Sequence, residues 1–80
     1  MTLKEIIENN PDVSFLTADG FDKAVIGYEP SSNRLVYDRT KMIDILVKRD
    51  KMDYDEAIEY LEYNTFGAYV GDETPIYIEA

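Results

Sequence analysis

Acidic side chains dominate the last part of this sequence and are the first candidates for chemistry. After Lys51 the chain contains no further Lys or Arg, although eight Asp and Glu residues follow. Clustered carboxylates can act as acid–base catalysts, bind divalent cations or attract basic partners. The eight acids are Asp53, Asp55, Glu56, Glu59, Glu62, Asp72, Glu73 and Glu79.

The spacing of the acids does not match a calcium-binding loop. An EF-hand needs oxygen ligands at its first, third and fifth positions and a glycine at the sixth. Counted from Asp50, the third position is Met52 and the fifth is Tyr54. Counted from Asp19, the third position is Phe21. We therefore expect no metal ion and no other cofactor.

Catalysis by these carboxylates is not expected either. The chain contains no His and no Cys, which removes the commonest general base and all thiolate chemistry. Gly67 and Gly71 flank three residues that match neither a phosphate-binding loop nor a dinucleotide fingerprint. A carboxylate also needs a concave, water-poor pocket to shift its pKa, and a chain of 80 residues has few layers to build one. We predict that the protein is not an enzyme.

A helix expected from Tyr54 to about Asn64 places part of the charge on one stripe. Asp55, Glu59 and Glu62 are spaced i, i+4, i+7, and Glu56 lies one residue round the helix. Like charges at these spacings repel each other. The helix dipole favours acids only in the first turn, so the charges of Glu59 and Glu62 lack local compensation.

Tyrosines accompany these acids, and exposed tyrosine is favoured at protein interfaces. We therefore predict a surface that binds a protein with a basic surface, formed by Asp55, Glu56, Glu59, Tyr60, Glu62, Tyr63 and Tyr69. Other interpretations stay open. The acids could mimic nucleic-acid phosphates. Alternatively, they could form a solvated face neutralised by the bases Lys48, Arg49 and Lys51 across the helix pair. The tyrosine rings could instead cover the edge of the sheet or an adjacent loop.

Two further hypotheses belong to other classes. One is a small-ligand, nucleotide-type site between the helices and the sheet near Asp19, Tyr37 and Asn64, because these polar residues stand at expected element ends. The other is a homo-oligomeric assembly component, such as a homodimer.

Charge and hydropathy exclude several partners. The net charge of −9 repels nucleic acid and anionic lipid, so we expect no direct nucleic-acid partner and no membrane partner. The chain has no apolar leader and no run of about 20 apolar residues that could span a bilayer. We therefore expect a cytoplasmic protein.

The hydrophobic pattern predicts the elements that must position these residues. We expect helices at 2–9, 40–49 and 54–64, and strands at 13–16, 23–29, 34–38 and 75–79. The second and third strands should form a hairpin closed by a Glu29–Arg34 ion pair, with Ala24, Ile26 and Tyr28 on one face. Strands that precede helices favour an α+β fold. We expect one domain, residues 1–80, with a small antiparallel sheet of three or four strands, two helices packed on one face and a short N-terminal helix.

Six sequence blocks run in order through most of the chain: DGFDKAVIG (19–27), LVYD (35–38), MIDIL (42–46), MDYDEA (52–57), EYNTFGAYVG (62–71) and TPI (74–76). In this order and spacing they resemble a family of small uncharacterised proteins of tailed phages and prophages. The family has no established activity. The resemblance implies a phage-encoded accessory factor in the bacterial cytoplasm. Together with the acidic stripe, it leads us to expect a small protein that binds and modulates a host protein.

Overall fold

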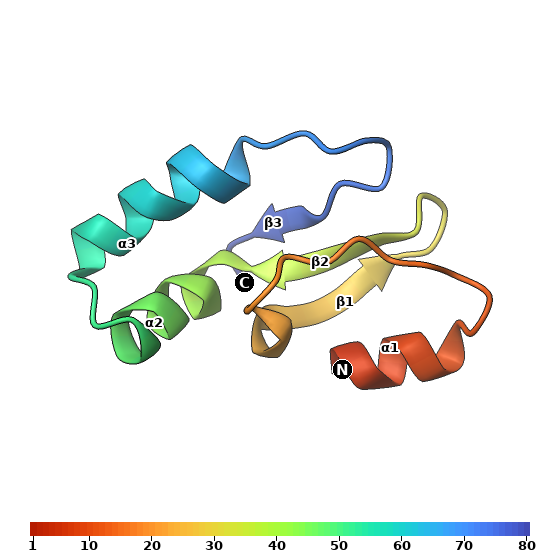
Figure 1. The fold of residues 1–80 in the computed structure, drawn as a ribbon. Coiled ribbons are helices and arrows are strands. Elements are labelled where there is room, and N and C mark those ends of the chain that lie inside the picture. The colour runs from red at the N-terminus through yellow and green to blue at the C-terminus, as the bar shows by residue number, and fades with distance from the viewer.

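A computed structural model describes residues 1–80 and shows an α+β fold built on a hairpin (Figure 1). Strands β1 (Val25–Glu29) and β2 (Arg34–Asp38) pair antiparallel, as the sequence predicts. The turn between them places Asn33 at φ 55°, a left-handed conformation that Asn tolerates better than most residues. The short helix α1 (Leu3–Asn9), which the sequence also predicts, packs against β1.

The hairpin contains a β-bulge that the sequence pattern did not reveal. Val25 is opposite Tyr37, but Gly27 is opposite Val36, so Ile26 is an extra residue in β1. The alternation of faces therefore shifts by one residue, and Val25 rather than Ile26 is buried on the core face. The expected grouping of Ala24, Ile26 and Tyr28 on one face was wrong for this reason.

The predicted Glu29–Arg34 ion pair does not form, although the two residues are opposite each other in the register. Glu29 instead accepts hydrogen bonds from the hydroxyl of Ser31 and from the Ser32 N–H in the turn. Arg34 Nε donates to the carbonyl of Thr74, which ties the hairpin to the segment before the last strand.

The third strand, β3 (Ile76–Ile78), pairs with β2 and runs parallel to it, so the sheet order is β1-β2-β3. The expectation of an entirely antiparallel sheet was wrong for this pair. After the helices, the chain runs back past the sheet to its far end before β3 begins (Figure 1). Parallel pairing requires such a long crossover, and the two helices with their connections provide it.

The expected strand at 13–16 does not form, and the sheet has three strands. This part of the chain instead crosses the face of the hairpin. Phe15 packs edge-on against Tyr28, with ring centroids 5.8 Å apart. The N–H of Ala18 donates to the hydroxyl of Tyr37 over 2.8 Å.

Two helices carry the rest of the core. Helix α2 (Arg39–Arg49) starts directly after β2, and Asp38 caps it by accepting from the Thr40 N–H at 2.9 Å. Helix α3 (Tyr54–Leu61) packs against α2. Figure 1 shows that the pair lies largely beyond the end of the sheet rather than over its face, and the molecule measures 39 × 23 × 20 Å. The buried core consists of Ile6, Phe21, Ala24, Val25, Leu35, Tyr37, Met42, Ile43, Leu46, Ala57 and Leu61.

Candidate protein-binding surface

The orientation of α3 is fixed by its start and by its buried side. Asp53 and Glu56 form the predicted capping box, in which Glu56 Oε1 accepts from the Asp53 N–H at 3.3 Å. Ala57 and Leu61 are fully buried against the core. Because these two residues face inward, the helix turns its opposite side to solvent.

The predicted acids occupy that solvent side and form a surface that we call the acidic ridge, consisting of Asp55, Glu56, Glu59 and Glu62. All four side chains are exposed. Asp55 and Glu56 lie in the first turn, where the helix dipole stabilises negative charge. Glu59 and Glu62 are further along the helix axis and lack this stabilisation.

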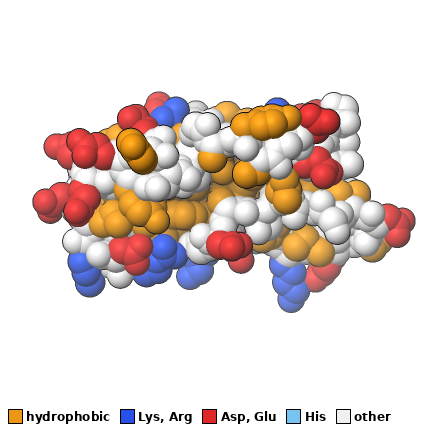
Figure 2. Space-filling model, turned by 45° about the horizontal axis from the view of Figure 1, so that its top comes forward, with side chains coloured by type: hydrophobic (Ala, Val, Ile, Leu, Met, Phe, Trp, Pro, Cys, Tyr) orange, Lys and Arg blue, Asp and Glu red, His pale blue; other side chains and the backbone are white.

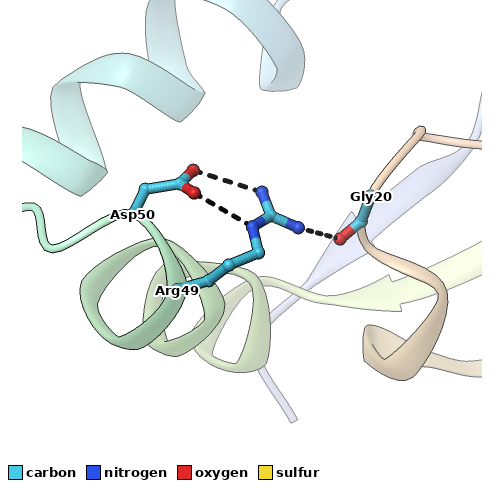
Figure 3. A network of polar contacts seen from close by, with 3 residues as sticks. All are labelled: Gly20, Arg49 and Asp50. Atoms are coloured by element: carbon cyan, nitrogen blue, oxygen red, sulfur yellow. Dashed lines mark hydrogen bonds and ion pairs between the residues drawn. The ribbon is translucent and has the colours of Figure 1, made fainter.

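No base neutralises the acidic ridge through an ion pair. The single ion pair of the chain joins Arg49 to Asp50 at 3.1 Å (Figure 3). The hydrogen bond from Arg49 holds the pKa of Asp50 below its usual value. The alternative in which Lys48, Arg49 and Lys51 pair with the ridge is therefore not supported, since Arg49 binds the adjacent Asp50 and neither lysine forms an ion pair.

Arg49 is also engaged away from α3. Its Nη1 donates to the carbonyl of Gly20 at 2.7 Å (Figure 3), and its guanidinium lies 5.5 Å from the centre of the Phe21 ring. These contacts fasten the segment before β1 to the end of α2. Arg49 is thus a link between elements of the scaffold.

Three tyrosines predicted for the surface are exposed, but they do not form one continuous row. Tyr60 is 45% exposed and Tyr63 is 91% exposed, and both border the acidic ridge. Tyr69 is 75% exposed but lies in the connection to β3, where its hydroxyl donates to Asp72 Oδ1 at 3.1 Å. The structure therefore places two of the three tyrosines beside the ridge, Tyr60 in the last turn of α3 and Tyr63 in the turn that follows it.

The predicted helix to Asn64 does not continue as an α-helix. After Leu61 it widens into a π-helical turn, η2 (Glu62–Phe66), which changes the angular spacing of the side chains. Phe66 closes the turn by packing on Tyr77, with ring centroids 5.2 Å apart, and under the guanidinium of Arg39 at 4.4 Å. Sequence reasoning missed this turn because its packing partners are distant in the chain.

Two of the three residues predicted for a small-ligand site line one hollow, which we call the α3 groove. This groove has a volume of about 420 Å³ and lies between residues 16–21, the end of α3 with η2, and the segment that leads into β3. Asp19 and Asn64 both line it, together with Tyr60 of the surface described above. The groove is bounded by apolar side chains as well, including Leu16, Phe21 and Tyr77.

Tyr37, the third predicted ligand residue, lies beneath this surface and does not line the groove. It is fully buried, and its hydroxyl already accepts from Ala18. Burial raises the pKa of the Tyr37 hydroxyl above its usual 10.0, and the negative charge of nearby Asp19 adds to this increase. The prediction of Tyr37 as a contact residue is corrected accordingly, since its role is to position the segment above it.

The bases of the chain gather elsewhere. Lys23, Lys41, Lys48 and Arg49 line a second, more open hollow between the segment before β1 and α2, and the acids Asp22 and Asp44 also line it. Figure 2 shows acidic side chains at the end formed by the helix pair, and basic side chains along the edge below them, where acidic side chains also lie. In this second hollow, bases and acids are therefore interspersed, unlike on the acidic ridge.

Other candidate sites receive no support from the geometry. No group of three or more carboxylates is arranged to hold a metal ion. None of the helices has the length and apolar character needed to cross a bilayer.

Comparison of the chain with models of protein families, with curated proteins and with solved structures finds no match.

Proposed function

We propose that this chain is a non-catalytic binding protein whose acidic ridge contacts a basic surface on another protein. The observation that carries the proposal is a ridge of four exposed carboxylates, three on α3 and Glu62 at the start of η2, that no Lys or Arg pairs with. Each like-charge contact along a helix costs about 0.2–0.5 kcal/mol. A basic partner would form ion pairs with the carboxylates of the ridge and would screen their mutual repulsion, so both effects would favour binding.

The tyrosines add the apolar part of such an interface. Tyr60 and Tyr63 are exposed beside the acids, and a tyrosine ring offers a large contact area with few rotatable bonds. Charges around such rings mainly accelerate encounter and select partners, whereas the rings contribute to residence time. The combination of carboxylates and tyrosines along α3 and the start of η2 supports a protein partner over a substrate.

The nature of the partner follows from the resemblance described above. If the chain is a phage-encoded accessory factor, its partner would be a host bacterial protein that it modulates in the cytoplasm. The net charge of −9 disfavours nucleic acid itself, while a nucleic-acid-binding protein presents the basic surface that the ridge would fit.

The test is a charge reversal on the ridge with a matched reversal elsewhere. Glu59→Lys/Glu62→Lys should reduce capture of the partner from bacterial lysate, and capture by the wild-type protein should weaken as salt is raised. Glu8→Lys/Asp12→Lys changes the net charge equally at exposed positions outside α3 and should retain capture. Equal capture by both double variants would refute the assignment of the ridge.

A small-ligand site is the second candidate, and the α3 groove is the observation that favours it. Asp19 and Asn64 were expected at such a site and line the same groove. The groove has a carboxylate and no Lys or Arg in its lining, which suits cationic or neutral ligands better than nucleotides. A thermal-shift screen that includes nucleotides and cationic metabolites tests it, and stabilisation by nucleotides alone would contradict this preference.

A further inference from the structure

We propose that the α3 groove receives an arginine side chain of the protein that lies on the acidic ridge. This inference rests on the proposed function and specifies how the partner is anchored. The groove and the ridge meet at Tyr60, which belongs to the exposed side of α3 and also lines the groove. A single partner segment can therefore cover both.

The size of the groove fits a side chain. Its volume of about 420 Å³ lies near the lower end of the roughly 300–1,000 Å³ typical of small-molecule sites. A folded element would not enter such a space, whereas a long side chain would. The apolar walls formed by Leu16, Phe21 and Tyr77 provide contacts for the methylene stem of that side chain.

The polar groups of the groove are suited to accept hydrogen bonds from a cation. The carboxylate of Asp19 is exposed and accepts only a long bond of 3.4 Å from the Thr17 hydroxyl. Asn64 donates its Nδ2 to the carbonyl of Tyr60 at 2.9 Å, which leaves its Oδ1 available as an acceptor. No Lys or Arg is among the lining residues. The guanidinium of Arg49, which lies near the Phe21 ring, is already bonded to Asp50 and to the Gly20 carbonyl.

Arginine fits these groups better than lysine does. Its planar guanidinium can donate two parallel hydrogen bonds to one carboxylate and can stack on an aromatic ring at the same time. The chain already places guanidinium groups over aromatic rings, since Arg39 lies over Phe66 at 4.4 Å and Arg49 over Phe21 at 5.5 Å. Arg49 also donates two hydrogen bonds to the Asp50 carboxylate. In the groove, Asp19 would supply the carboxylate and Tyr60 the ring.

The proposal can be tested with a single residue in place of the partner. N-acetyl-arginine amide is titrated into ¹⁵N-labelled protein, with the neutral isostere N-acetyl-citrulline amide as the matched probe. We expect saturable shifts at Ala18, Asp19 and the Asn64 side-chain amide with the arginine probe and not with citrulline. Asp19→Asn should weaken this binding about three- to tenfold. Ala68→Trp, which fills the groove from an exposed position that lines it, should abolish it.

Failure of this inference is distinguishable from failure of the proposed function. In the Glu59→Lys/Glu62→Lys variant, the arginine-induced shifts of the groove residues should be unchanged, because neither residue lines the groove. The same variant should capture less partner. Equal shifts with arginine and citrulline, or unchanged arginine affinity in Asp19→Asn with a well-dispersed spectrum, would overturn the groove assignment. The capture experiment alone would then test whether the acidic ridge binds the partner.

Discussion

Replacing Tyr37 by Phe tests whether one buried hydroxyl holds the crossing segment onto the hairpin. The Tyr37 ring is fully buried, and its hydroxyl accepts from the Ala18 N–H at 2.8 Å. The Phe variant keeps the ring and removes the acceptor. An unpaired buried donor costs about 1–3 kcal/mol. Because Ala18 is only partly buried, water can replace part of the bond, so we expect a loss near the lower end, about 1 kcal/mol.

The same substitution has a pH dependence of known sign. Burial raises the pKa of Tyr37 above 10.0 in the folded protein, so the folded state favours the neutral phenol. This contribution to stability is complete below the unfolded pKa and is lost as the pH rises through the folded pKa. The Phe variant has no ionisable hydroxyl at this position and therefore does not lose this contribution. The difference in stability between wild type and variant should therefore shrink as the pH rises above 10.0.

Urea denaturation at neutral and alkaline pH measures both effects. With an m-value of about 1 kcal/mol per molar urea for a chain this small, the midpoint should fall by about 1 M at neutral pH with m unchanged. Tyr28→Phe is the matched control, because Tyr28 is half-buried and its bond to Asn10 is long, 3.4 Å. A loss no larger than that of the control, or a difference that stays constant into the alkaline range, would refute the reasoning.

Three further substitutions test the backbone and the start of α2. Gly20 has φ 89°, and an added Cβ would lie 3.1 Å from Arg49 Nη1, so Gly20→Ala should lower stability by about 1–3 kcal/mol. A Cβ added at Gly27 would have no neighbouring atom within 4 Å, so Gly27→Ala should be neutral or stabilising by about 0.4–1 kcal/mol. Thermal melts of the two variants measure this difference. Equal losses of stability would contradict the argument. Asp38→Ala removes the buried cap of α2 and should cost about 1–2 kcal/mol in urea denaturation, whereas an unchanged midpoint would show that the cap is dispensable.

The elements that depend on local sequence could be predicted, and those that depend on distant packing could not. The hairpin follows from the Pro30–Asn33 turn between two apolar runs, and α1 from the Thr2 capping box, which the structure contains. Gly27 is a local signal of the bulge at Ile26, because a glycine inside a strand often marks a bulge, but the hydrophobic pattern does not include it. The π-helical turn at Glu62–Phe66 carries no local signal. Each exists because the surrounding core sets where the side chains must point.

The candidate surface was predictable where helical spacing alone determined exposure. Asp55, Glu59 and Tyr63 lie on the solvent side because Ala57 and Leu61 occupy the buried side. The spacing of the residues could not show that Arg49 pairs with Asp50 rather than with a carboxylate of the acidic ridge. It also could not show that residues 16–21 return beside η2, which is what creates the α3 groove.

The direction of β3 determines where additions to the chain can be made. Because β3 is parallel to β2, Ile78 lies beside Asp38 at the start of α2. A tag fused after Ala80 therefore emerges near the helix pair. Met1 precedes α1, which packs against β1 at the opposite edge of the sheet. Met1 and Lys41 of α2 line one hollow, so an affinity handle or fluorophore on the N-terminal side emerges beside the first turn of α2.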